Sequence, residues 1–459
     1  MPSSVVDSAL LRDLYGTEEM RRIFADESLV QRWLDVEAAL AQAEAEFGVI
    51  PAWAAVEIGR QARVELLDLT AIKREIDRTG HAIVAFIRVF QALCEGEAGQ
   101  YIHWGATTQD IIDSATVLQL GDACQVIVRE LRDIEGLLID LAERHRDTIM
   151  AARTHGQQAL PTTFGFKVAG WMREIRRHLV RCGELRPRLL VGQLGGAVGT
   201  MASFGPQALE VQRRTLEILG LGVPDVTWHA SRDRFAELAN VLALVAGTLA
   251  RIGNEVYELQ KTEFGELEEP FAPGKVGSST MPHKRNPQLC EAVVFTARTV
   301  QQNAGLMLAA MVQEHERDTR LWRLEWHLLP ESCIMLGAAL HKTRLILGGL
   351  RVNTTRMREN LDLLRGLLLS EAVMLALAER VGRQEAHEIV YEVAMPAFER
   401  GAHLADALAA DPRVIRHLDR AAIAELLRPE RYLGLAPQLV DELVAQTRRE
   451  RVAEAEHPA

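Results

Sequence analysis

Residues 233–269 read DRFAELANVLALVAGTLARIGNEVYELQKTEFGELEE, a stretch of over thirty residues without proline. Its apolar residues recur every three or four positions, which is the period of an amphipathic helix. Residues 110–147, with one weak point at Gly121, and residues 287–318 have the same character. Helices this long and this apolar usually bury several faces. The sequence therefore predicts a bundle of long helices that forms the centre of the protein and its oligomer interface.

Shorter helical stretches flank this bundle. Residues 27–51 have helical periodicity and stop at Gly48 and Pro51, as helices normally do. No β-rich block, repeat or low-complexity segment is apparent. We expect an all-α protein of three helical domains, with boundaries near Trp104 and Leu350. The domains are a small N-terminal domain (1–104), a long central bundle that contains a stiff loop (105–350) and a small C-terminal domain (351–459).

The composition limits the partners. Hydrophobic residues make up 48% of the 459 residues and charged residues 25%, a globular balance, and the net charge of -11 argues against binding a phosphate backbone. The N-terminus lacks a basic segment followed by an apolar run, and no apolar run approaches the ~20 residues of a membrane span. The five cysteines are dispersed, as expected for reduced thiols. We expect a cytoplasmic protein that binds neither nucleic acid nor membrane.

A stiff loop interrupts the helices at residues 268–287, EEPFAPGKVGSSTMPHKRNP, which hold four prolines and two glycines. Pro and Gly fix a backbone that exposes consecutive amides, and Lys284 and Asn286 lie on one side of an extended segment. Such a group suits a carboxylate that gains charge in a transition state. Amides and a nearby cation can also stabilise a serine alkoxide as a proton acceptor. The loop is thus either a site that removes a proton next to a carboxylate or a plain tight turn.

A second polar stretch is IHWGATTQDIID, residues 102–113. Gly105 breaks the helical pattern, and Thr107, Thr108 and Asp110 follow it. This spacing predicts a helix N-terminus, where a Thr or Asp side chain accepts free backbone amides. A helix start is also a natural anion site, so a structural cap and a binding site both remain open.

Two further stretches carry polar groups between helices. RTHGQQALPTTFG, residues 153–165, places Thr154 and His155 in a predicted loop, where the histidine is either structural or a proton donor to a leaving group. ELQKTEFGELEEPF places Gln260 at the end of a long helix.

The sequence matches no known cofactor-binding or metal-binding motif. GQLGGAVGT, residues 192–200, is glycine-rich but has no preceding strand, which argues against dinucleotide binding. HEIVY, from His387, begins like a zinc-protease motif and lacks its second histidine. No Cys/His cluster has metal-ligand spacing.

GSSTMPHKRNP, residues 277–287, resembles the signature loop of the fumarase/aspartase superfamily. HWGATTQDIIDSA (103–115) and RTHGQQALPTTFG (153–165) resemble its other two shared regions, so the resemblance covers essentially the whole chain. It implies an all-helical homotetramer with a central twenty-helix core and active sites assembled from three subunits. It also implies β-elimination of a small dicarboxylate substrate, usually with release of fumarate from a succinyl compound, without a metal or an organic cofactor.

The resemblance assigns reacting roles residue by residue. Ser278 matches the base that takes the proton from the carbon beside a carboxylate. Lys284 and Asn286 match the residues that bind that carboxylate and its enediolate-like form. His155 matches the general acid of the adenylosuccinate lyase branch, and Glu291 matches the carboxylate that orients this histidine.

The resemblance also assigns substrate-binding positions. These are Thr107, Thr108, Thr154, Gln260, Ser279 and Met281. His81, in TGHAIVAF, resembles a second active-site histidine of adenylosuccinate lyases, although those enzymes carry HD where this chain has HA.

The flanking segments resemble two branches. WHASRDR (228–234) and EHERDTRLWRLEWHLLPE (314–331) are similar to 3-carboxy-cis,cis-muconate cycloisomerases, whereas RTHGQQALP is similar to adenylosuccinate lyases. Where adenylosuccinate lyases carry Ser and Arg for the nucleotide phosphate, this chain has Trp322 and Trp326. Arg320 and Arg323 are the candidates to compensate as substrate ligands. Trp326 is expected to pack in the core.

These features predict a carbon–nitrogen lyase that cleaves an N-substituted aspartate, or a related amino- or nitro-succinate, into fumarate and an amine or its analogue. A nitrogen leaving group needs a proton, which His155, oriented by Glu291, would supply. A 3-carboxymuconate cycloisomerase is the first alternative and an adenylosuccinate lyase the next. An inert structural protein on the same fold is the alternative outside enzymes.

Overall fold

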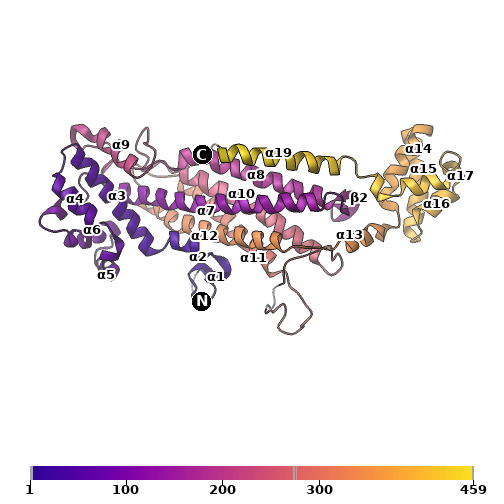
Figure 1. Cartoon of the computed structure of the whole chain (residues 1–459), viewed down its shortest axis with the longest axis horizontal. Coiled ribbons are helices and arrows are strands. Elements are labelled where there is room, and N and C mark those ends of the chain that lie inside the picture. The colour runs from indigo at the N-terminus through magenta and orange to yellow at the C-terminus, as the bar shows by residue number, and fades with distance from the viewer. Residues whose placement is uncertain (1–3, 272–273, 275, 457–459) are drawn as a thin grey trace. The chain divides into compact units, whose positions relative to one another are not determined.

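A computed structural model describes residues 4–271, 274 and 276–456. The three N-terminal residues and, in the proline-rich stretch, Ala272, Pro273 and Lys275 lie outside this description. Helices dominate the chain (Figure 1), and the described residues form only two small sheets of two strands each. The prediction of an all-α fold is confirmed.

One compact unit comprises residues Met1–Leu131, His178–Ala250 and Ala292–His341. Its core packs Trp33, Phe86 and Phe90 against Ile111 and Trp322. The shorter helices of this unit are α1 (Arg12–Tyr15), α2 (Glu18–Ile23), α3 (Asp26–Glu46), α4 (Ala52–Gln61), α5 (Leu69–Thr79), α6 (Ala82–Leu93) and α9 (Ala208–Ile218), with the 3₁₀ turns η1 (Val5–Asp7), η2 (Val64–Leu66), η3 (Ala98–Tyr101) and η4 (Gly205–Gln207).

The other unit comprises residues Arg132–Arg177, Arg251–Glu291 and Lys342–Ala459. A core of small and aliphatic side chains, among them Val373, Leu377 and Leu404, holds its last helices together. The helices of this unit are α13 (Thr354–Leu361), α14 (Ser370–Val381), α15 (Arg383–Glu399), α16 (Leu404–Ala410), α17 (Pro412–Ile415), α18 (Arg420–Leu426) and α19 (Ala436–Glu456), with the 3₁₀ turns η5 (Asp362–Leu364), η6 (Leu367–Leu369) and η7 (Pro429–Arg431). The three-domain division at Trp104 and Leu350 stays a prediction.

Five long helices have residues in both units, and three of them correspond to the long apolar stretches identified in the sequence. They are α7 (Thr108–Arg144), α8 (Phe164–Leu189), α10 (Asp233–Gln260), α11 (Gln288–Ala310) and α12 (Thr319–Gly348). Helix α7 continues through Gly121, where an added Cβ would lie 3.1 Å from a methyl carbon of Leu190. A glycine costs about 1 kcal/mol in a helix, and at this position it allows the close approach of residue 190.

Strands β1 (Ile149–Thr154) and β2 (Gln157–Thr163) form an antiparallel hairpin where the sequence predicted a loop. Thr154 pairs with Gln157, so the hairpin turn consists of His155 and Gly156, with φ of 52° and 75°. Positive φ at both central residues is the geometry of a type I′ turn, whose twist matches that of the strands. The second sheet pairs β3 (Leu267–Glu268) with β4 (Arg351–Val352).

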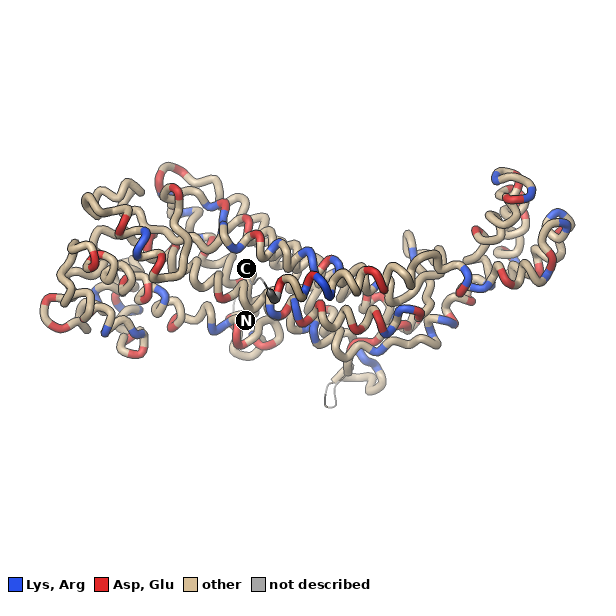
Figure 2. The backbone as a smooth tube through the Cα atoms, turned by 45° about the horizontal axis from the view of Figure 1, so that its top comes forward, with Lys and Arg blue, Asp and Glu red and all other residues tan. Residues whose placement is uncertain are grey.

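Helices α7 and α10 are long and apolar enough, by length and composition, to cross a membrane. The expectation that no apolar run has this character is therefore corrected. In each helix 61% of the apolar window is buried inside the chain, which is typical of core helices. Lys, Arg, Asp and Glu are interspersed along the helices (Figure 2).

Candidate active site

The signature loop (residues 277–287) folds back on itself. An added Cβ at Gly277 would lie 2.2 Å from the carbonyl oxygen of Lys284, so only glycine permits this approach. The Asn286 side-chain amide donates to the Gly277 carbonyl at 2.7 Å, and the Lys284 amide donates to the Met281 carbonyl at 3.0 Å. These contacts join the two ends of the loop into one compact turn.

Ser278 lies near the start of this turn and is half-buried. Its Oγ accepts hydrogen bonds from the Met281 amide at 3.0 Å and the Thr280 amide at 3.3 Å. Hydrogen bonds to the charged form of a group favour that form. The two amides therefore point where an alkoxide would carry its charge, which is the environment that a serine base needs. Ser279, Met281 and Lys284 are exposed on the same turn.

Gln260 attaches the loop to the end of α10. Its Oε1 accepts the Glu269 amide at 2.8 Å, and its Nε2 donates to the Arg285 carbonyl at 3.2 Å. Arg285 in turn donates to Glu268 at 2.9 Å. Both ends of the Gln260 amide thus bind backbone, so the predicted substrate ligand is also a structural bridge.

Sequence reasoning missed two glutamates beside the loop. Glu269 is buried, and its two oxygens accept the amides of Leu289 and Cys290 at 3.0 and 2.9 Å, which caps the first turn of α11. Glu266 is buried as well and binds Arg153 of β1 at 2.6 and 3.0 Å. The acidic run GELEE was visible before the loop, but nothing in it indicated these partners.

Thr154 and His155 lie exposed at the tip of the β1–β2 hairpin. Glu291 is exposed on the first turn of α11. Among the described residues, no hydrogen bond joins His155 to Glu291. Burial raises the pKa of the neighbouring Cys290 thiol far above its ordinary value. This cysteine is therefore a neutral thiol and not a nucleophile.

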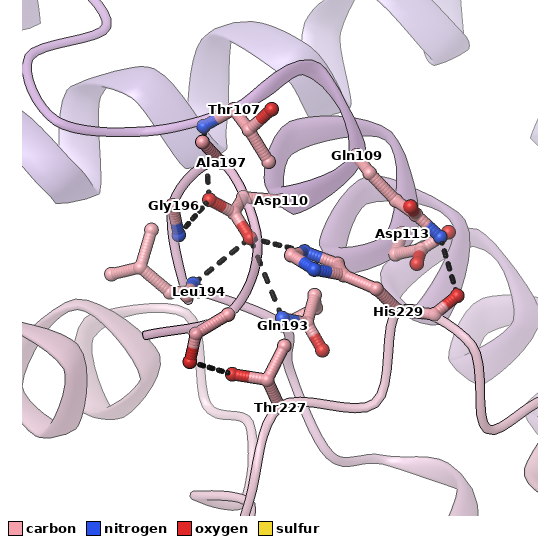
Figure 3. A network of polar contacts seen from close by, with 12 residues as sticks. Thr107, Gln109, Asp110, Asp113, Gln193, Leu194, Gly196, Ala197, Thr227 and His229 are labelled. Atoms are coloured by element: carbon pink, nitrogen blue, oxygen red, sulfur yellow. Dashed lines mark hydrogen bonds and ion pairs between the residues drawn. The ribbon is translucent and has the colours of Figure 1, made fainter. Parts of the chain in front are cut away.

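The predicted helix start at Gly105 is confirmed. Gly105 has a φ of 74°, and α7 begins at Thr108. The Asp110 carboxylate accepts the Thr107 amide at 3.0 Å, as the fourth residue of a capping box does. Asp110 also binds amides of the 192–200 loop and the His229 ring (Figure 3).

His81 and Arg320 have local partners. His81 is the N-cap of α6, and its Nδ1 accepts the Val84 amide at 3.3 Å. The Arg320 guanidinium binds Asp318 at 2.9 Å through two nitrogens and lies 2.7 Å from Glu314. The Arg320 hydrogen bonds lower the pKa of Asp318 to about 2. Two carboxylates therefore already match the positive charge of this candidate substrate ligand.

The two tryptophans after this segment differ. Trp322 is 4% exposed in the core and donates from Nε1 to Asp113 at 3.0 Å. Trp326 is 43% exposed. The expectation that Trp326 packs in the core is therefore wrong for the single chain. One turn further along α12 than Trp322, its ring meets the Trp322 ring edge to face, and the Arg323 guanidinium lies over it, 6.0 Å from the ring centroid.

The candidates fall into two groups. Ser278, Lys284, Asn286 and Gln260 come together around the signature loop, in the same unit as the hairpin and Glu291. The candidates in the other unit are Thr107, Thr108, His81 and Arg320. Among the described residues, no group of three or more His, Cys, Asp or Glu side chains is arranged to hold a metal ion.

Comparison with known proteins shows the family of this chain. A family model described as Lyase matches residues 15–302, and one described as Adenylosuccinate lyase C-terminus matches residues 366–443. The N-acetyl-S-(2-succino)cysteine lyase of Dickeya dadantii is 46% identical over 97% of this chain and 98% of that protein. The 3-carboxy-cis,cis-muconate cycloisomerase of Pseudomonas aeruginosa is 42% identical over 97% of each chain.

A solved structure, the fumarate lyase from Mesorhizobium sp. BNC1, superposes with a TM-score of 0.89 at 41% identity, covering 94% of this chain and 98% of that one. The chain therefore belongs to the fumarase/aspartase superfamily. As a member, it is a fumarate-releasing lyase.

Proposed function

We propose that this enzyme cleaves the carbon–sulfur bond of an S-succinylated, N-acylated cysteine, with N-acetyl-S-(2-succino)cysteine as the first candidate substrate. The supporting observation is the 46% identity, over almost the full length of both chains, to a lyase named for that compound. Elimination would release fumarate and N-acetylcysteine. This proposal replaces nitrogen by sulfur as the preferred leaving atom and keeps the succinyl part of the predicted substrate.

In the proposed reaction Ser278 removes a proton from the succinyl carbon beside a carboxylate, while Lys284 and Asn286 bind that carboxylate. The electrons of the C–H bond form the new C=C bond, and those of the C–S bond leave with sulfur. The amides of Thr280 and Met281, at 3.3 and 3.0 Å from the Ser278 Oγ, support the serine in its alkoxide form. This contact is the geometric observation that best supports the chemistry.

How much acid catalysis His155 must provide depends on the leaving group. A cysteine thiol has a pKa of about 8.5, so a thiolate leaves with little help from an acid. An amine leaving from carbon needs a proton to depart. His155 is exposed at the hairpin tip and is free to protonate either product. The presence of a histidine at this position favours the second candidate, an N-substituted aspartate.

We also propose the homotetramer that the family resemblance implies, with each active site shared by three subunits. Helices α10, α11 and α12 expose large apolar side chains in the single chain, which a helical interface would cover. These side chains are Leu244, Phe295, Leu306, Leu308 and Leu345.

The test is fumarate release, followed by mass spectrometry, from N-acetyl-S-(2-succino)cysteine, adenylosuccinate and argininosuccinate, with 3-carboxymuconate assayed for lactone. Ser278→Ala is the inactive control. Fumarate from the sulfur compound is expected. Fumarate from a nitrogen compound alone would favour the second candidate, and lactone without fumarate would favour a cycloisomerase.

His155→Asn separates the two leaving groups, because Asn tolerates the positive φ of this turn. We expect it to lower kcat about tenfold or less on the sulfur compound, against about 10²–10⁴-fold on a nitrogen compound. Equal losses on both classes would contradict the role assigned to His155.

A further inference from the structure

The segment WHASRDR (residues 228–234) contacts one face of α7 through polar side chains. His229 and Arg232, three positions apart, meet Asp110 and Asp113, which are also three positions apart and so share a helix face. His229 Nε2 lies 2.8 Å from Asp110, and Arg232 donates to Asp113 at 2.7 and 3.0 Å. Arg232 also donates to Glu325 at 2.8 Å. This spacing fixes the register of the segment on the helix.

Asp110 is 0% exposed, and its carboxylate is surrounded by donors from three segments. Oδ2 accepts the amides of Thr107 at 3.0 Å and Gly196 at 2.9 Å. Oδ1 accepts the Gly195 amide at 2.9 Å and the His229 Nε2 at 2.8 Å, with a weaker contact from Gln193 at 3.4 Å (Figure 3). A buried carboxylate requires such partners. The Asp110 side chain therefore holds together the turn before α7, the glycine-rich loop and the WHASRDR segment.

The His229 ring is itself held in place. The backbone carbonyl of His229 accepts a hydrogen bond from the Gln109 side-chain amide at 2.8 Å. The neighbouring Trp228 is also fixed, because its backbone amide donates to the Gln193 side chain at 2.8 Å and its indole donates to the Gly192 carbonyl at 2.9 Å. His229 is 3% exposed, and its Nδ1 has no hydrogen-bond partner among the described residues. A hydrogen on that buried nitrogen would be unsatisfied, so the ring donates from Nε2 to Asp110.

We propose that His229 is a positioning residue for substrate binding. Acting through Asp110, which accepts the Thr107, Gly195 and Gly196 amides, it holds the Thr107–Thr108 turn against the glycine-rich loop. The Thr107 and Thr108 side chains are thereby placed to bind a carboxylate of the succinyl substrate or of fumarate. The inference rests on the proposed lyase function and on the substrate-binding role that the family resemblance implies for Thr107 and Thr108. It does not depend on which atom leaves. It gives the glycine-rich loop, which matches no dinucleotide motif, a place in the reaction.

Substitution of His229 by Gln and by Asn distinguishes a role in positioning Asp110 from a role in packing alone. In His229→Gln the amide nitrogen can occupy the place of Nε2 and donate to Asp110, whereas in His229→Asn it reaches only the place of Nδ1. Thr248→Val is the structural control, because the buried Thr248 hydroxyl forms a hydrogen bond with His178 Nε2 at 2.8 Å and, among the described residues, none with Asp110, His229 or the 192–200 loop.

The measurement is the Kd of fumarate by calorimetry for the full-length protein and these variants, together with KM and kcat on the substrate that wild type turns over. His229→Asn is expected to weaken fumarate binding about tenfold to a hundredfold, the effect of losing a hydrogen bond to a charged group. KM is expected to rise more than kcat falls. His229→Gln should stay within about threefold of wild type, and Thr248→Val should lower the unfolding midpoint without changing Kd.

Amide hydrogen exchange provides the second readout. The amides of Thr107, Gly195 and Gly196 should exchange faster in His229→Asn and at the wild-type rate in His229→Gln. Wild-type fumarate affinity in His229→Asn, or equal losses in the Asn and Gln variants, would overturn the inference. Fumarate contains no leaving group, so its Kd tests this inference even if the enzyme does not cleave the sulfur compound.

Discussion

The start of α7 and the signature loop are held in place in opposite ways. At the start of α7 the fully buried Asp110 joins segments that lie up to 119 positions apart. In the loop the half-buried Ser278 is held by amides two and three positions away. Removing the first contact leaves several buried donors unsatisfied, whereas removing the second leaves exposed backbone that water can reach. Stability and function are therefore coupled at the helix start and separable in the loop.

The largest effect is expected from Ser278→Ala. Loss of the proposed base should lower kcat for fumarate release by about 10²–10⁴-fold, and the unfolding midpoint should change by no more than about 2 °C. Steady-state kinetics and calorimetry check the two halves of this prediction. Ser279→Ala is the neighbouring comparison, with a far smaller loss of kcat. A strongly destabilised Ser278→Ala protein would remove the contrast between the two regions.

Asp110→Ala should lower the stability of the folded state, which Ser278→Ala leaves nearly unchanged. It removes the buried partner of His229 and of three backbone amides, and we expect the free energy of unfolding to fall by about 3–5 kcal/mol. Urea denaturation measures the change. Asp77→Ala is the matched control, because Asp77 is exposed and pairs with the exposed Lys73. That substitution should cost about 1 kcal/mol or less. Equal costs at the two sites would show that the Asp110 contacts are not what holds this region.

Glu44 tests what burial does to a carboxylate without partners. It is 0% exposed, neither oxygen has a hydrogen-bond partner among the described residues, and burial, aided by the charge of Glu37, raises its pKa to about 9. The folded state thus keeps a proton that the unfolded chain loses above its ordinary pKa of 4.5. Stability should therefore fall as pH rises from 4.5 towards 9, by about 1.4 kcal/mol per pH unit.

Urea midpoints at about pH 6 and about pH 8 measure this slope. Glu44→Gln, which keeps the shape and cannot ionise, should lose most of the difference between the two conditions. An unchanged slope in Glu44→Gln would assign the pH dependence to another group. Within any single pH unit, this change in the free energy of unfolding is smaller than the effects expected from Ser278→Ala and Asp110→Ala.

Local signals in the sequence predicted local structure. The loop residues Ser278, Lys284 and Asn286 are nearly contiguous, and Gly105 followed by Thr107 marks a helix start that the structure confirms. The partners of these elements could not be predicted in the same way. Asp110 was visible as a cap, but its contact with His229 depends on how two distant segments pack. Glu269 was visible as an acid before a proline, but its role at α11 depends on the path of the intervening loop.

The β1–β2 hairpin was missed for a different reason. Its turn is His155–Gly156 and not the Asn-Gly or Asp-Gly pair that signals a type I′ turn. The strand IMAART also lacks the alternation of apolar and polar residues that identifies a half-buried strand.

The backbone at His155 limits how this position can evolve. A φ of 52° is tolerated by Gly, Asn, Asp and His and is strained for β-branched residues. A lineage that changes its substrate can therefore replace the imidazole at the hairpin tip by only a few side chains without rebuilding the turn. Of these, Asp is acidic, Asn can only form hydrogen bonds, and Gly supplies no side chain. The range of chemistries open to descendants of this enzyme is set here by a two-residue turn as much as by the reaction.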